Sequence, residues 1–110
     1  MSALTEVGSG QLALSGPLTL STIPGLARQA QRLFKGLHKQ SEMQPRLIEI
    51  DLSGVERSSS AGIALLIEWV DQAGRDGIKL HFQHCPEALQ RIALFSNVDH
   101  LLGLEASQHG

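Results

Sequence analysis

Residues 47–82 constrain the fold more than any other part of the chain. They begin with an apolar, β-branched run at 47–52, which is typical of a buried central strand. We expect Ser53-Gly54 to end this strand, a helix to run to about Gly74, and residues 78–82 to form a further strand. Such strand–helix–strand units are right-handed and place their two strands parallel. The sequence therefore predicts a domain of the α/β class.

The segments before this unit add a helix and further strands. Residues 11–15 alternate polar and apolar side chains, the period of a half-buried strand, and residues 5–7 are a candidate hairpin partner. Residues 23–37 carry apolar side chains at helical spacing, with Ser21 or Thr22 as the N-cap. We expect this helix to end before the polar loop that leads into the central strand.

The segments after this unit predict one more helix and a short closing segment. Pro86 begins the helix, and the closing segment covers residues 98–104. The side chains of this helix that we expect to face the core are Leu89, Ile92, Ala93 and Phe95.

Length and composition indicate one domain over residues 1–110. The length falls within the common domain size of about 100–150 residues, and the 42% hydrophobic content is enough for a core. We expect the core to span about residues 5–104, followed by a polar tail at 105–110. The net charge is −2, with no strongly basic half, which argues against general nucleic-acid binding because that needs dense positive charge.

The chain has no sequence signal for export or for a membrane span. Its one cysteine, Cys85, cannot form an internal disulfide, and residues 1–6 lack the basic and apolar regions of a secretory signal. The longest apolar run, residues 63–67, is far shorter than the roughly 20 residues that cross a bilayer. We therefore expect a soluble, cytoplasmic protein.

A run of three serines, Ser58, Ser59 and Ser60, lies where a loop enters the second helix. One interpretation is structural: Ser59 or Ser60 is the N-cap, and its oxygen accepts a free backbone N–H. The other interpretation is functional, because hydroxyls and free N–H groups at a helix start bind anions or polar groups of a partner. On that interpretation Ser59 and Ser60 are also candidate phosphosites.

The second helix carries more apolar surface than one sheet covers. Its expected core face is Ile63, Leu66, Ile67 and Val70. Leu65 and Trp69 lie one turn apart on a neighbouring arc. They form either the edge of the core or an exposed apolar patch beside the serine run. We favour the exposed patch, because tryptophan is enriched among residues that dominate interface energies.

The remaining reactive side chains do not assemble a catalytic or metal site. His81, His84 and Cys85 are too few for zinc, and positions 81 and 84 of a strand point to opposite faces. Cys85 lacks the pattern of a base-activated nucleophile, and the chain contains no glycine-rich phosphate loop. We therefore expect a protein that is not an enzyme and that holds no metal and no cofactor.

A basic stripe of Arg28, Arg32, Lys35 and Lys39 runs along the first helix at steps of four and three. Such a stripe is most often a solvated helix face. Contact with acidic lipid or with an acidic partner is the alternative, and the sequence leaves this choice open.

Two segments carry a family resemblance. Residues 48–55 read IEIDLSGV and residues 59–66 read SSAGIALL. Together they resemble the STAS domain, in which a strand ending in D-L-S-x-V precedes a helix that starts with D-[ST]-x-G. The resemblance covers about residues 11–104 and is most specific over 48–77. It implies an α/β fold of the STAS type, a mixed β-sheet of about four or five strands with helices packed on one face.

Within this family, the chain is most similar to the small STAS subunits of Mla-type phospholipid ABC transporters. In the related anti-sigma-factor antagonists, the phosphorylated serine directly precedes the motif glycine, where this chain has Ala61. The acidic residue of the motif falls at Ser59. In the transporter subunits, a threonine one place before the phosphosite matters for partner contact, and Ser60 matches it. These departures favour the transporter interpretation.

The resemblance thus implies a non-catalytic accessory subunit, peripheral at the inner membrane, that binds and regulates the ABC ATPase subunit. Combined with the apolar patch, it predicts that the partner contacts are Ser58, Ser59, Ser60, Gly62, Leu65 and Trp69. The alternative is an anti-sigma-factor antagonist that binds a serine-kinase-like partner.

Overall fold

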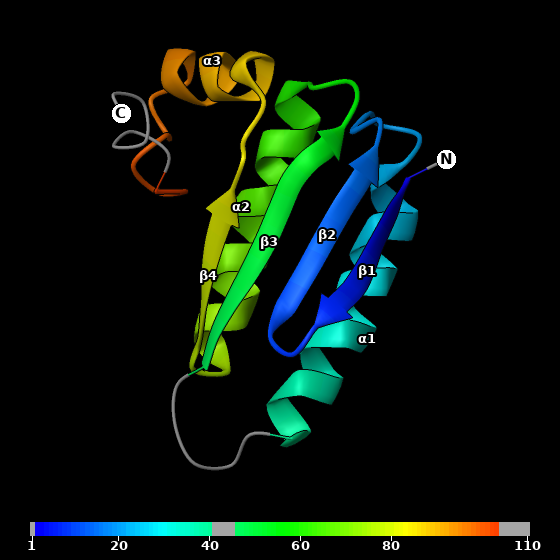
Figure 1. Ribbon diagram of the computed structural model, residues 1–110. Coiled ribbons are helices and arrows are strands. Elements are labelled where there is room, and N and C mark those ends of the chain that lie inside the picture. The colour runs from blue at the N-terminus through cyan, green and yellow to red at the C-terminus, as the bar shows by residue number, and fades with distance from the viewer. Residues whose placement is uncertain (1, 41–45, 104–110) are drawn as a thin grey trace.

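The computed structural model describes residues 2–40 and 46–103 of the chain (Figure 1). The predicted tail at 105–110 and the side chain of Lys39 lie outside what it describes. Within those ranges the strands are β1 (Ala3–Gly8), β2 (Gln11–Gly16), β3 (Arg46–Val55) and β4 (Ile78–Gln83). The helices are α1 (Ile23–Gln40), α2 (Ser60–Arg75) and α3 (Glu87–Phe95). No helix in the described ranges is both long and apolar enough to cross a bilayer.

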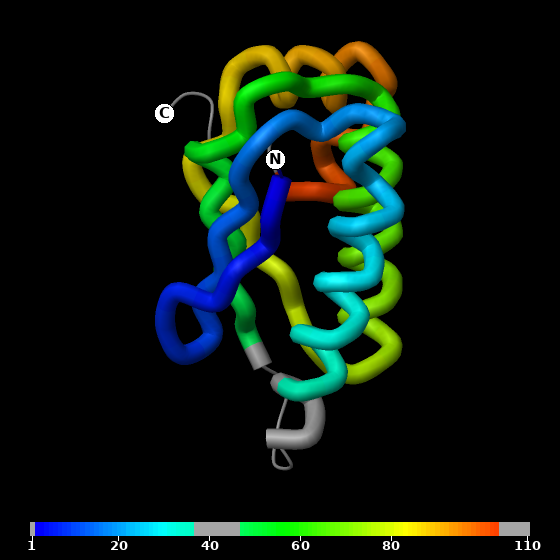
Figure 2. Tube along the Cα trace, turned by 90° about the vertical axis from the view of Figure 1, so that its right-hand side faces the viewer, coloured from blue at the N-terminus to red at the C-terminus, as the bar shows by residue number. Residues whose placement is uncertain are grey.

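The strands form one mixed sheet in the order β1-β2-β3-β4. β1 and β2 make the predicted antiparallel hairpin, whereas β2 with β3 and β3 with β4 are parallel, as their helical crossovers require. Figure 2 shows α1 and α2 side by side on one face of the sheet. α3 lies beyond the carboxyl-terminal end of β4 (Figure 1). The predicted fold class is confirmed.

The central strand β3 is longer than predicted. Ser53-Gly54 does not end it, because the strand continues to Val55 and Gly54 pairs with Ser15 of β2. A side-chain carbon at Gly54 would lie 3.1 Å from the Cβ of Ser15 and 3.2 Å from the carbonyl oxygen of Leu14. Glycine here permits a close approach of two strands where their pairing register shifts.

The core lies between the sheet and the two helices that cover it. The predicted stripe of α1 is confirmed at Leu26, Ala30 and Phe34, which are all at most 1% exposed. Ile48 and Ile50 of β3 face this helix layer and are fully buried. Alternation along the strand places Glu49, Asp51 and the half-exposed Leu47 on the opposite, open face of the sheet.

The predicted core face of α2 is confirmed at Ile63 and Leu66, which are 4% and 0% exposed, but the buried face is centred further round the helix than predicted. Leu65 and Trp69, predicted as an exposed patch, are 5% and 1% exposed, whereas Ile67 and Val70 are only partly buried. The reason is the neighbouring helix: the ring of Phe34 on α1 meets Trp69 edge to face, with 6.2 Å between ring centroids. α2 therefore turns its largest side chain toward both the sheet and α1.

The predicted inward face of α3 is correct at three positions and wrong at one. Leu89 and Ala93 are fully buried, and Ile92 packs against the core, but Phe95 is 95% exposed. Phe95 is the last residue of α3, and Asn97 then takes a left-handed backbone conformation with φ of 64°. With about 3.6 residues per turn, Phe95 lies about 200° around the helix from the buried Ala93, so its side chain points away from the core.

Candidate partner-binding site

Two loops meet beyond the carboxyl-terminal ends of β2 and β3. Because these strands are parallel, the β2–α1 loop (17–22) and the β3–α2 loop (56–59) leave the sheet at the same edge. Two hydrogen bonds join the two loops: Leu18 N–H donates to the Arg57 carbonyl (2.9 Å), and the Ser59 hydroxyl donates to the Leu18 carbonyl (2.8 Å). A third bond, from Glu56 N–H to the carbonyl of Gly16 at the end of β2 (3.0 Å), ties the second loop to the sheet. The loops therefore form one continuous surface.

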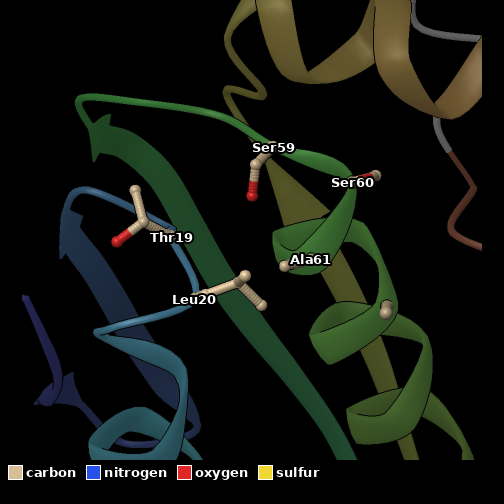
Figure 3. Close-up of a pocket in the computed structure, with 6 residues that line it drawn as sticks. Thr19, Leu20, Ser59, Ser60 and Ala61 are labelled. Atoms are coloured by element: carbon tan, nitrogen blue, oxygen red, sulfur yellow. The ribbon is translucent and has the colours of Figure 1, made fainter.

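A shallow groove of about 520 Å³, here called the Leu20 groove, lies between the β2–α1 loop and the start of α2. Its lining residues are Thr19, Leu20, Ser59, Ser60, Ala61 and Ala64. Leu20 is 80% exposed, and its side chain points from the loop toward α2 and Ala61 (Figure 3). A lone exposed leucine is common on protein surfaces, but one that forms the wall of a groove offers apolar contact to another molecule.

The β2–α1 loop is braced by the hydroxyl of Thr22. Its Oγ1 accepts a hydrogen bond from Thr19 N–H (3.0 Å) and lies 2.9 Å from the carbonyl oxygen of Pro17, to which it donates. Thr22 directly precedes α1, as predicted for an N-cap, but these bonds are made to the loop backbone. They fix the backbone on both sides of Leu20 and so present its side chain in one place.

Ser59 is the N-cap of α2, as the structural interpretation of the serine run predicts. Its backbone is extended, and its Oγ accepts from Gly62 N–H at 3.3 Å while donating to the Leu18 carbonyl at 2.8 Å. The hydroxyl of Ser59 is therefore engaged within the molecule both as a hydrogen-bond donor and as an acceptor. Ser60, the first residue of α2, is exposed, and Ser58 is half-buried.

We expect Ser59→Ala to lower the free energy of unfolding by about 1 kcal/mol, because it removes the cap and leaves the Leu18 carbonyl without its donor. Urea denaturation followed by circular dichroism measures this change. Ser58→Ala is the matched control and is expected to stay within about 0.5 kcal/mol of the unaltered protein. Equal losses for the two variants would contradict the capping role.

Gly62 supports the Leu20 groove from below and is itself buried. A side-chain carbon at this position would lie 2.8 Å from the Cβ of Leu18 and 3.0 Å from its Cδ1. Leu18 is fully buried, and its backbone makes both of the hydrogen bonds between the loops, so it has little room to retreat. Gly62 therefore positions the β2–α1 loop without facing a partner.

The predicted contacts at Leu65 and Trp69 are wrong. Trp69 of α2 is buried against Phe34 of α1, and its Nε1–H has no hydrogen-bond partner within the described part of the chain. The exposed α2 residue beside the Leu20 groove is instead Ala64. Sequence reasoning missed Leu20, although an aliphatic residue among the hydroxyls of a helix-start segment was a usable signal.

Two histidine–carboxylate pairs lie on the open face of the sheet. His81 Nδ1 is 3.9 Å from Glu49 Oε2, and His84 Nδ1 is 3.2 Å from Asp51 Oδ1. A backbone hydrogen bond from Ser53, with His84 as a smaller contributor, lowers the pKa of Asp51. The prediction that the histidines point to opposite faces is wrong, because His84 follows β4 in a left-handed conformation with φ of 56°.

The remaining candidates from the sequence are Cys85, a metal site and the basic stripe of α1. Burial raises the pKa of the Cys85 thiol to about 11, so it stays protonated at neutral pH and is a poor nucleophile. Among residues 2–40 and 46–103, no three His, Cys, Asp or Glu side chains converge on a possible metal position. Arg28, Arg32 and Lys35 are exposed, and whether they bind lipid or an acidic partner stays a prediction.

Comparison with known proteins identifies the family. The model of the family described as "Mlab, STAS domain" matches residues 3–103 of this chain. The chain belongs to this family. No curated protein matches this MlaB-like STAS domain significantly.

Solved structures share the fold of this MlaB-like STAS domain. An anti-sigma factor antagonist from Mycobacterium paratuberculosis is 22% identical, with a TM-score of 0.62, and the match covers 93% of this chain and 81% of that one. A structure described as "Crystal Structure Analysis of Mglu" is 20% identical, with a TM-score of 0.55, over 77% of this chain. The match spans only 19% of that second protein. At these identities, the likeness establishes the fold alone.

Proposed function

We propose that this MlaB-like STAS domain is a non-catalytic accessory subunit of an inner-membrane phospholipid ABC transporter of the Mla type. It binds the ATPase subunit on the cytoplasmic side of the membrane. The observation that carries the proposal is the Leu20 groove, where an 80% exposed leucine faces the start of α2. Membership of the MlaB-like family supplies the class of partner.

In this proposal the ATPase subunit places an apolar side chain in the Leu20 groove, between Leu20 and Ala64. Ser60 and the free N–H groups at the start of α2 bind polar or acidic groups at the rim of that contact, where the helix dipole favours negative charge. Ser58, Ser59 and Gly62 shape the surface from within. The subunit acts by stabilising and orienting its partner and performs no chemistry of its own.

Co-expression with the ATPase subunit encoded in the same genome tests this function. We expect the two proteins to co-purify as a stoichiometric complex, and the rate of ATP hydrolysis to differ between the complex and the ATPase alone. Separate elution of the two proteins, together with an unchanged hydrolysis rate, would rule the proposal out.

The second candidate function is an anti-sigma-factor antagonist, and the exposed hydroxyl of Ser60 at the start of α2 is the observation in its favour. Ala61, at the position of the family phosphosite, has no hydroxyl, and the hydroxyl of Ser59 is engaged by Leu18 and Gly62. Incubation with a serine-kinase-like anti-sigma factor and ATP distinguishes the two functions. Stoichiometric phosphate on Ser60 would support the antagonist, and its absence supports the transporter subunit.

A further inference from the structure

The end of α3 and the turns that follow it carry three exposed large apolar side chains. Phe95, Leu94 and Leu101 are 95%, 65% and 52% exposed. The intervening chain folds into consecutive turns, in which Leu101 N–H donates to the Val98 carbonyl at 3.0 Å. Leu102, 4% exposed, fixes this segment in the core. The closeness of the three exposed side chains in the sequence makes this segment a candidate contact surface.

A small depression of about 200 Å³, here called the Leu101 depression, lies between this segment and α2. It is lined by Ile67, Val70, Asp71 and Leu101. Ile67 and Val70 pack against the core but are only half covered, because α2 turns Trp69 inward in their place. The depression has room for one large apolar side chain of a partner, and the carboxylate of Asp71 lies at its edge.

The exposed side of α2 connects the Leu101 depression to the Leu20 groove. Ala64 lines the groove, and Ile67, three residues later and therefore on the same side of the helix one turn on, lines the depression. In Figure 3, Ser60 points away from Leu20, toward the side of α2 on which α3 lies. A partner that fills the groove and crosses α2 therefore meets the depression about one helical turn, roughly 5 Å, further along.

We propose that the ATPase subunit straddles α2, placing one apolar side chain in the Leu20 groove and a second in the Leu101 depression, and that its contact extends to the exposed Phe95 at the end of α3. This inference rests on the proposed function. A single partner is inferred for both hollows because Ala64 of the groove and Ile67 of the depression lie one turn apart on the same side of α2.

The Leu101 depression has an acidic edge. Asp71 lines the Leu101 depression, and Glu68 is exposed one turn before it on α2. Asp71 pairs with Arg75, but both side chains are more than half exposed, and such pairs contribute little, so the carboxylate stays available to a partner. The partner's second apolar side chain is therefore flanked by lysine or arginine.

Binding of the ATPase subunit to single variants, measured by isothermal titration calorimetry, tests this inference. We expect Leu101→Asp and Phe95→Ser each to raise the dissociation constant about tenfold or more. Leu47→Asp is the matched control, because Leu47 is 53% exposed but lies on the open face of the sheet, and its dissociation constant is expected to change less than about twofold. Thermal melting verifies that each variant is folded, and Phe95→Ser alters a side chain outside the core.

The outcomes separate the two proposals. If Leu20→Asp weakens binding while Leu101→Asp and Phe95→Ser do not, the straddling arrangement is wrong and the proposed function stands. If Leu47→Asp weakens binding as much as Leu101→Asp, the effect is not specific to the depression, and the arrangement is also wrong. If the unaltered protein forms no complex with the ATPase subunit, both proposals are wrong.

Discussion

Replacing Trp69 with alanine is expected to lower the free energy of unfolding by about 3–5 kcal/mol, because a large fully buried side chain is lost and a cavity remains. Trp69 is 1% exposed and contacts Phe34 of the neighbouring helix edge to face. It therefore joins α1, α2 and the sheet in a single core. Chemical denaturation followed by circular dichroism measures the loss, which represents a large part of the stability of a domain of this size.

Trp69→Phe is the control for ring contact. It keeps an aromatic ring against Phe34 and removes the indole N–H, which has no partner within the described residues, so we expect a cost below about 2 kcal/mol. A Trp69→Ala variant that keeps its stability but binds the ATPase subunit tenfold more weakly would show that the indole is a surface contact. That result would contradict the buried position.

Two glycine-to-alanine changes in α2 are expected to act in opposite directions. At Gly62 the added carbon lies 2.8 Å from the Cβ of Leu18, which is closer than real contacts, so Gly62→Ala is expected to destabilise by about 1–3 kcal/mol. At Gly74, in the same helix, no atom lies within 4 Å of the added carbon. There the helix propensity of alanine prevails, and Gly74→Ala is expected to stabilise by about 0.5–1 kcal/mol.

Urea denaturation of both glycine variants, under the same conditions, gives this comparison directly. Because Leu18 and Leu20 lie in the same loop, Gly62→Ala is also expected to displace Leu20 and weaken partner binding more than its loss of stability alone explains. A stabilising effect at both positions would mean that the β2–α1 loop moves freely, and that Gly62 does not position it.

The strands and helices were predictable because each depends mainly on local pattern. Alternation over residues 11–15 and helical spacing over residues 23–37 act within one element, and the crossover rule then fixes the parallel pairing. Ser53-Gly54 misled the prediction, since glycine usually weakens a strand. Here it allows close contact with Ser15 across the sheet, which no local pattern encodes.

The candidate site was only partly predictable, because it depends on contacts between distant segments. The serine run marked the start of α2, and Ser59 and Ser60 lie in the Leu20 groove as that placement requires. The exposure of Trp69 depended on which neighbour covers α2, and α1 does so through Phe34. Leu20 joins the site only because two parallel strands bring their following loops to one edge of the sheet.

The central claim is that the Leu20 groove binds the ATPase subunit, and the dissociation constants of two variants on its opposite walls test it most directly. Leu20→Asp places a charge on the loop wall, and Ala64→Arg places a long cation on the wall formed by α2. Calorimetry is predicted to show binding weakened about tenfold or more by each change, with folding intact. Unaltered affinity in both variants would contradict the claim.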